Sequence, residues 1–122
     1  EHVVSLSPAQ QAALDALDRR LAAASFEGLA FDETVSAAPE LLQLLLDAGS
    51  AERVTDRILH RDALAELVDR VRAHLVAHET LQPGDFKTLT GLSRRTAIPL
   101  LEWLDARRVT VRMGDLRRLR TP

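Results

Sequence analysis

The sequence contains no cysteine, and aromatic residues account for only 3% of its 122 positions. Without cysteine the chain can form neither disulfides nor thiolate metal sites, a composition that fits a reducing cytosol. No apolar stretch approaches the roughly 18 residues of a membrane-spanning helix, and the amino end lacks the basic and apolar regions of a signal peptide. We therefore expect a cytoplasmic protein without a membrane partner. Because the chain does not begin with Met, we also expect a fragment of a longer protein.

The net charge of −2 conceals a strong asymmetry between the two parts of the chain. Residues 1–84 hold 7 Lys/Arg and 14 Asp/Glu, whereas residues 85–122 hold 9 and 4, so their net charges are −7 and +5. Such an asymmetry is a recognised sign of a polyanionic partner. The basic carboxy-terminal part is therefore the first place to look for function.

The first half of the chain predicts two helices and a β-hairpin. Ser7 and Gln10 can form a capping box around Pro8, so a helix should begin here and continue to about residue 24. A second helix should begin at Pro39 and end at Gly49, where glycine can take the left-handed conformation. The remaining segments are an irregular stretch at 25–36 and two short strands within 52–60, around a turn near Thr55-Asp56.

The second half repeats this order of elements. Asp62 can cap a long helix that ends near His78, with an apolar stripe along one side. The elements expected after it are a short helix over 83–90, a helix from Ser93 to about 107, and strands at 109–113 and 116–120 around Gly114-Asp115.

A tight turn separates the last two helices. Gly91 can leave the first of them in the left-handed conformation, and Ser93 can cap the second. Pro99 interrupts the pattern, because proline removes a backbone donor and crowds the preceding turn. We expect a kink or a loose first turn there, and a helix that begins only at Thr96 is the other possibility.

Both halves thus read as long helix, helical segment, helix and hairpin, with a period of about 60 residues. A three-helix core with a terminal hairpin is the winged-helix plan, a variant of the helix-turn-helix. The scarcity of aromatic residues leaves Leu, Val and Ala for the core, which favours helix. We predict a mainly α protein with short β-hairpins (α+β) and tandem winged-helix domains. Residues 1–60 form an abbreviated, spacer-like domain because 25–36 looks too irregular for a helix, and residues 61–122 bind nucleic acid.

The predicted nucleic-acid surface lies at the start of the last helix. A helix-turn-helix presents its second helix amino end first, and here that end is Ser93-Arg94-Arg95-Thr96, where the helix dipole and free backbone donors favour phosphate. The other cations of this surface are Lys87 on the preceding helix and Arg112, Arg117, Arg118 and Arg120 on the hairpin.

One interpretation is that these arginines form an ordinary solvated surface. The presence of nine Lys and Arg residues among the 38 residues from 85 to 122 instead favours a nucleic-acid interface. Strand alternation places Arg118 and Arg120 on one face of the hairpin, and Arg117 on the other with Leu119, near the core. Phe86 and Trp103 lie in apolar stretches and should belong to the core. Recognition should then rest on phosphates, shape and a few base contacts.

Residues 86–105, with 109–110 and 112–115, closely resemble the last winged-helix domain of bacterial SelB, the selenocysteine-specific elongation factor. The shared pattern is a Phe, a Leu-x-Gly-x-Ser-Arg/Lys turn, Ala-Ile-Pro-Leu-Leu-Glu and a Gly-Asp wing tip. It includes Pro99. The resemblance over residues 5–80 is looser and rests on the order and length of the elements.

The resemblance implies that the domain grips the selenocysteine-insertion hairpin of a messenger RNA (the SECIS element) as a monomeric tether. By position, Arg94 and Arg95 would hold the RNA backbone, and the wing from Arg112 to Arg117 would contact loop or bulged bases. At the wing tip Gly114 and Asp115 form the turn, and Asp115 either shapes it or accepts a hydrogen bond from a base. The chain departs from the family at Val111 and Leu116, where the family often has Arg and Lys.

For the rest of the parent protein, the resemblance implies a GTPase that uses GTP and Mg²⁺ and meets selenocysteyl-tRNA and the ribosome. The chain itself has no Gly-x-x-x-x-Gly-Lys-Ser/Thr loop, so we expect no enzyme activity and no cofactor. His74 and His78 are four residues apart, a spacing that can hold zinc, but no His-Glu-x-x-His motif exists. We interpret them as surface histidines and expect no metal.

Two other functions stay open. A DNA-binding regulator would use side chains along the last helix, from Thr96 onward, in a major groove. An RNA reader would use the helix start and the wing, because the A-form major groove is too narrow for a helix. A protein-interaction scaffold would instead pair the arginines with acidic surfaces. The resemblance favours RNA, whereas composition alone does not separate the three.

Overall fold

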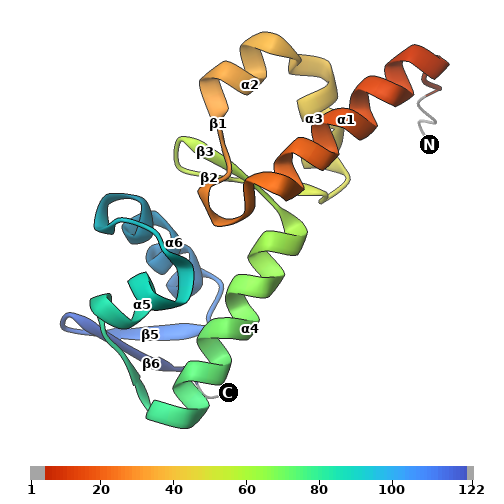
Figure 1. Cartoon of the computed structure of the whole chain (residues 1–122). Coiled ribbons are helices and arrows are strands. Elements are labelled where there is room, and N and C mark those ends of the chain that lie inside the picture. The colour runs from red at the N-terminus through yellow and green to blue at the C-terminus, as the bar shows by residue number, and fades with distance from the viewer. Residues whose placement is uncertain (1–4, 121–122) are drawn as a thin grey trace. The chain divides into compact units, whose positions relative to one another are not determined.

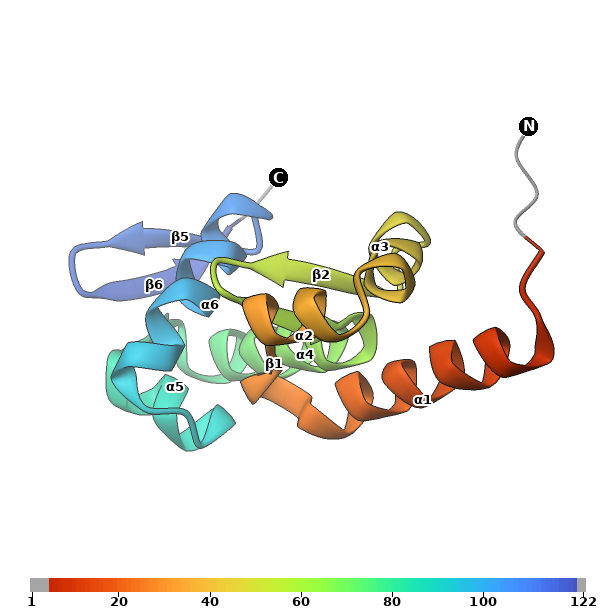
Figure 2. The ribbon, with the colours of Figure 1, turned by 90° about the horizontal axis from the view of Figure 1, so that it is seen from above.

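The computed structural model describes residues 5–120 and divides the chain into two compact units, one ending at Arg61 and the other beginning at Asp62. Figures 1 and 2 show the elements of each unit. The predicted domain boundary, between residues 60 and 61, lies one residue from this division. Among the described residues no helix is both long and apolar enough to cross a membrane.

The first unit contains a complete winged-helix order. Its elements are α1 (Pro8–Ala24), a 3-10 turn (Ser25–Glu27), β1 (Leu29–Ala30), α2 (Phe31–Ala37), α3 (Pro39–Asp47), β2 (Ala51–Val54) and β3 (Arg57–His60). The three strands are antiparallel in the order β1-β3-β2. The predicted capping box at Ser7 and Gln10 is confirmed, with both hydrogen bonds present. The buried residues Leu17, Leu21, Leu42, Leu45, Ala51 and Ile58 form the core of this unit.

The prediction that residues 25–36 are irregular, and the first domain abbreviated, is wrong. The segment contains β1 and most of α2, a helix of seven residues against eight in α5, its counterpart. No side chain caps α2, and Thr34 and Val35 are weak helix formers, so the local signal is faint. Strand β1 exists because Leu29 pairs with Ile58 of β3, a contact between distant residues that sequence periodicity does not report.

The second unit repeats the order with clearer local signals. Its elements are α4 (Arg61–His78), β4 (Thr80–Leu81), α5 (Pro83–Thr90), α6 (Arg94–Ala106), β5 (Thr110–Met113) and β6 (Leu116–Leu119). The strand order is β4-β6-β5, again antiparallel. The bounds of α5, the apolar face of α6 and the hairpin agree with the prediction, and Phe86 is fully buried. Strand β4 was not predicted, because it has only two residues and depends on pairing with β6.

Three local predictions need correction. Helix α4 begins at Arg61, so Asp62 lies inside its first turn and is not the residue that precedes the helix. The N–H of Arg61 donates to the Ser50 carbonyl. Ser93 is the N-cap residue of α6, but its hydroxyl pairs with the Thr96 hydroxyl at 3.2 Å and makes no capping bond. Helix α6 begins at Arg94 and continues through Pro99, so the later start at Thr96 is wrong.

The repeat extends to individual hydrogen bonds. Helices α3 and α6 both end in a Schellman motif, with Gly49 and Arg108 in the left-handed position. In the hairpins, Arg53 Nε donates to the Thr55 carbonyl at 2.7 Å, and Arg112 Nε donates to the Gly114 carbonyl at 2.9 Å. These shared bonds establish which residues of the two units correspond.

Candidate nucleic-acid interface

The turn between α5 and α6 fixes the direction of the amino end of α6. Gly91 adopts a left-handed conformation (φ 74°, ψ 3°), and its N–H donates to the Lys87 carbonyl at 2.7 Å. Leu92 is buried and anchors the turn in the core, while Arg94 and Arg95 at the start of α6 are exposed. The free N–H groups of the first turn thus lie beside two guanidinium groups, an arrangement that favours an anion.

The register of the hairpin distributes the wing cations over two faces. Residues directly opposite on antiparallel strands point to the same face. Arg112 pairs with Arg117, whereas Val111 pairs with Arg118, so the predicted separation of Arg117 and Arg118 is confirmed. Arg118 shares the outer face with the exposed side chains of Val111 and Met113. It is therefore not part of the same surface as Arg112.

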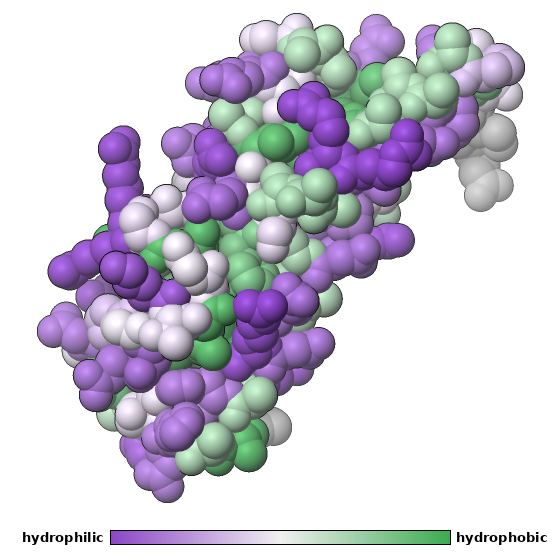
Figure 3. Space-filling model, in the orientation of Figure 1, coloured by the Kyte–Doolittle hydropathy of each residue, from purple (hydrophilic) through white to green (hydrophobic). Residues whose placement is uncertain are grey.

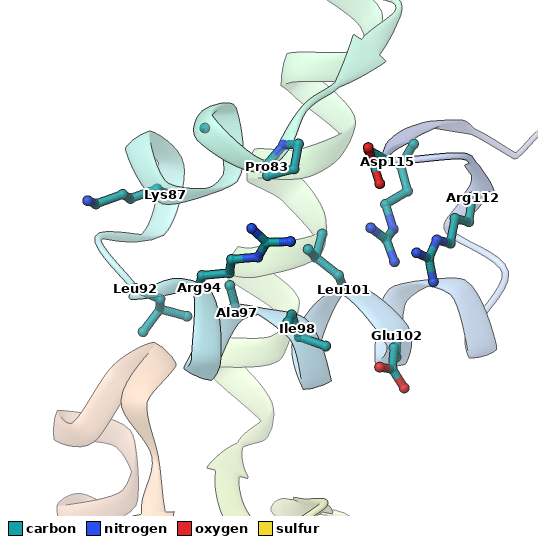
Figure 4. Close-up of a pocket in the computed structure, with 12 residues that line it drawn as sticks. Pro83, Lys87, Leu92, Arg94, Ala97, Ile98, Leu101, Glu102, Arg112 and Asp115 are labelled. Carbon is teal, nitrogen blue, oxygen red and sulfur yellow. The ribbon is translucent and has the colours of Figure 1, made fainter.

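A groove of about 300 Å³ lies between α5, α6 and the wing (Figure 4). Its cations are Lys87, Arg94, Arg112 and Arg117, its carboxylates are Glu102 and Asp115, and its remaining lining is Pro83, Gly84, Leu92, Ala97, Ile98 and Leu101. In Figure 4, Arg94 and Arg112 extend toward the groove from α6 and from the wing, whereas Lys87 points away along α5. Figure 3 shows hydrophilic side chains around this region, with smaller apolar areas between them.

The groove brings together only some of the predicted residues. Lys87, Arg94, Arg112, Asp115 and Arg117 line it. The predicted residues that lie outside its lining are Ser93, Arg95 and Thr96 at the helix start, Gly114 at the wing tip and Arg118 on the outer face.

The apolar floor of the groove was missed by the sequence prediction. Ile98, 44% exposed, lies one turn after Arg94, and Leu101 follows at the next turn of the same helix face. This spacing from Arg94 is the signal that could have revealed the floor. Glu102 lines the groove as well, so the lining combines cations, two carboxylates and an apolar surface.

Arg117 is the least exposed of the predicted residues, at 7%. Its Nη2 donates to Asp105 Oδ2 at 3.1 Å, and Asp105 Oδ1 accepts a bond of 2.6 Å from the Thr110 hydroxyl. Within residues 5–120, Arg117 Nε is buried and has no hydrogen-bond partner. An unpaired buried donor costs about 1–3 kcal/mol, so this arrangement calls for a reason other than stability.

Phe86, Trp103 and His74 do not line the groove. Phe86 belongs to the core, as predicted, whereas Trp103 is partly exposed with the Arg107 guanidinium 5.1 Å from its ring centroid. His78 is exposed as predicted, but the prediction of a surface histidine is wrong for His74. Its side chain is only 15% exposed, and its Nε2 lies 3.1 Å from the Thr80 carbonyl oxygen and 3.5 Å from Asp85 Oδ2. No group of three or more metal-ligating residues occurs in the part of the chain that the structure describes.

The chain is similar in sequence to selenocysteine-specific elongation factors. Residues 73–119 match the family model for the winged helix of elongation factor SelB. Over 82 residues, 66% of the chain, the sequence is 35% identical to the selenocysteine-specific elongation factor of Desulfomicrobium baculatum, and this alignment spans 13% of that protein. The chain is thus similar to a small part of a much longer relative.

Two solved structures have similar folds. The mRNA-binding domain of elongation factor SelB from E. coli, in complex with SECIS RNA, matches with a TM-score of 0.73 and 22% identity, over 91% of this chain and 97% of that one. A bacterial selenocysteine-specific elongation factor matches with a TM-score of 0.72 and 26% identity, over 88% of this chain and 18% of that one. The fold of the chain is therefore that of these winged-helix proteins.

Proposed function

We propose, since this chain belongs to the SelB winged-helix family, that its second unit binds the SECIS hairpin of a messenger RNA. The observation that carries the proposal is the groove of the second unit, which Arg94 approaches from the start of α6 and Arg112 from the wing. The similar E. coli domain was solved with SECIS RNA. A hairpin offers both a phosphate backbone and unpaired bases, which match these two sides of the groove.

In this proposal the start of α6 holds the RNA backbone. Arg94 and Arg95 supply charge beside the free backbone N–H groups of the helix, and charge-assisted bonds to phosphate are short and strong. Such contacts position the RNA but carry little sequence information. Affinity should therefore fall steeply as salt rises.

The wing and the groove supply the base contacts. A volume of about 300 Å³ lies at the lower end of small-ligand sites, which suits one unpaired base better than a stretch of duplex. The Nε of Arg112 is engaged by the Gly114 carbonyl, which fixes the guanidinium and leaves its other donors for RNA. Asp115 offers an acceptor for a base N–H at the same rim.

The body of α6 argues against the DNA alternative. Its exposed residues beyond Thr96 include Ile98, and Glu102 is exposed one turn later. A helix lying in a DNA major groove reads bases with side chains along its exposed face and needs cations near the flanking phosphates, but α6 has no Lys or Arg from Thr96 to Glu102. The cations are instead at the helix start and on the wing, which can contact an RNA hairpin without placing a helix in the narrow A-form major groove.

The chain would work as a tether. Holding the messenger hairpin raises the effective concentration of the rest of the factor near the ribosome, without new contacts. In this proposal the longer parent protein supplies the GTPase with its GTP and Mg²⁺ and meets selenocysteyl-tRNA. The chain itself acts in the cytoplasm as a monomer and catalyses no reaction.

Fluorescence anisotropy tests the proposal. The chain is titrated at physiological salt against three labelled ligands: a SECIS hairpin from a selenoprotein messenger of the same host, that hairpin with a scrambled loop, and a DNA duplex. Tight binding to the intact hairpin alone is the expected result and locates specificity in the loop. Equal, weak binding to all three would mean a non-specific basic surface and would refute hairpin recognition.

A further inference from the structure

We infer, given the RNA-binding function proposed above, that Asp105 is a positioning residue that acts on RNA through Arg117. Asp105 is near the carboxyl end of α6 and does not line the groove, whereas Arg117 does. The Asp105 carboxylate binds Arg117 through Oδ2 at 3.1 Å and the Thr110 hydroxyl through Oδ1 at 2.6 Å. One side chain thus ties α6 to both strands of the wing.

Burial makes this carboxylate necessary for Arg117. The Arg117 side chain is only 8% exposed, and a buried guanidinium without a counter-charge is strongly disfavoured. The ion pair also fixes one edge of the guanidinium plane. Nε shares an edge with Nη2 and is itself buried without a partner within residues 5–120, but Arg117 lines the groove with the rest of its side chain. An acceptor oxygen of an unpaired nucleotide would meet the positive charge of Arg117 at the atoms that line the groove.

The first unit shows that the fold does not need the polar trio of Asp105, Thr110 and Arg117. By the hairpin register and the shared Schellman motifs, Leu46, Ala51 and Ile58 occupy the positions of Asp105, Thr110 and Arg117. Ile58 and Ala51 are buried core residues, and Leu46 packs against the same core. An apolar trio therefore closes the same junction in a unit of the same fold. The polar trio in the second unit is better explained by ligand binding than by folding.

The test uses a double-mutant cycle in the full chain, with the intact SECIS hairpin as the probe. Asp105→Asn and Arg117→Met are measured singly and together, at several salt concentrations, with thermal unfolding of each variant. We expect each single change to weaken hairpin binding about tenfold, as when one charge-assisted hydrogen bond is removed. If Asp105 acts through Arg117, the double variant should bind no more than about twofold more weakly than Arg117→Met alone.

Two further variants separate positioning from folding. Thr110→Ser keeps the hydroxyl and should bind RNA as the unchanged chain does, whereas Thr110→Val should follow Asp105→Asn. The matched control is Glu66→Gln, which removes a carboxylate from the exposed Glu66–Arg70 pair of the same unit and should leave hairpin affinity unchanged.

Several outcomes would overturn the inference. Additive losses in the cycle would show that Asp105 and Arg117 act separately, and an Asp105→Asn variant that unfolds earlier but binds equally would show a purely structural role. Should Arg117→Met fail to fold, the Thr110→Ser and Thr110→Val comparison decides alone. Failure of the unchanged chain to bind the hairpin would refute the proposed function itself and is distinguishable, because it appears before any substitution is made.

Discussion

The two units have the same fold but opposite charge. Up to Arg61 the chain holds 5 Lys/Arg and 10 Asp/Glu, a net charge of −5, and from Asp62 onward it holds 11 and 8, a net charge of +3. The helix ends, the hairpin turns and the strand order are nevertheless shared. The fold alone therefore does not set the charge of the surface, and the difference lies in which side chains the shared scaffold presents.

The helix start and the wing of the first unit present different side chains from those of the second. The third helix of the first unit, α3, has 9 residues against 13 in α6 and lacks the first turn of α6, so it opens with Pro39 and Glu40 and has no counterpart of the helix start at Arg94 and Arg95. Arg53, the counterpart of Arg112, lies 3.7 Å above the ring centroid of Phe31. An acidic helix start repels phosphate, and an arginine that packs on a neighbouring ring is less available to a ligand.

Removing the Phe86 side chain from the core should have the largest effect on stability and should unfold the second unit. Phe86 is fully buried at the fourth position of α5, and Phe86→Ala should lower the free energy of unfolding by about 3–5 kcal/mol. Thr34 is buried at the corresponding position of α2, and Thr34→Ala should lower it by only about 1 kcal/mol. Denaturant unfolding measures both; equal losses would mean that the two cores are not built differently at this position.

Removing the cations at the start of α6 should abolish the functional contrast between the units. The double variant Arg94→Ala/Arg95→Ala should bind the hairpin on the order of a hundredfold more weakly, at roughly tenfold per charge-assisted bond. The slope of log affinity against log salt should fall by roughly 0.7 for each phosphate that the protein no longer binds. As a matched control, Glu40→Ala at the start of α3 should not weaken binding. An unchanged affinity and slope in the double variant would rule out this site.

Gly28 in the first unit and Gly91 in the second both have a positive φ, but they differ in the space available for an added Cβ. At Gly28 (φ +65°) an added Cβ would collide with the backbone carbonyl of Ile58, whereas at Gly91 (φ +74°) nothing lies within 4 Å of it. Gly28→Ala should therefore destabilise the chain by about 2–3 kcal/mol, and Gly91→Ala by about 1 kcal/mol. Thermal unfolding of the two variants checks the order, and a larger loss at Gly91 would contradict it.

Exchanging the polar trio should have the smallest effect on folding. The variant Asp105→Leu/Thr110→Ala/Arg117→Ile copies the corresponding residues of the first unit. Replacing a buried ion pair by apolar residues is often neutral or stabilising, so stability should stay within about 1 kcal/mol or rise. Hairpin affinity should fall about tenfold with the loss of the Arg117 donor. A folded variant with full affinity would show that the trio serves no RNA contact.

Local signals explain which parts of this fold could be predicted from the sequence. The capping box at Ser7, the left-handed Gly91 and the alternation of the β5–β6 hairpin all act within a few residues. Strands β1 and β4 have two residues each and exist only through pairing with distant strands, so no periodicity could reveal them. Helix α2 lacks a side-chain cap, and for that reason the first domain was wrongly predicted to be abbreviated.

The candidate site was predictable in its charges but not in its shape. The cations at Arg94 and Arg112 follow from the helix-turn-helix and the hairpin. The burial of Arg117 depends on Asp105, 12 residues away, and the apolar floor at Ile98 depends on how the wing meets α6. These are tertiary contacts, which a pattern of residue types along the chain does not specify.

The central claim is that the second unit, and not the first, binds the hairpin. Amide chemical-shift mapping of the full chain by NMR, with and without the intact SECIS hairpin, tests it most directly. We predict shifts concentrated in residues 87–97 and 110–118, with little change in α2, α3 and the β2–β3 hairpin. Shifts of equal size in the first unit, or shifts confined to it, would contradict this assignment.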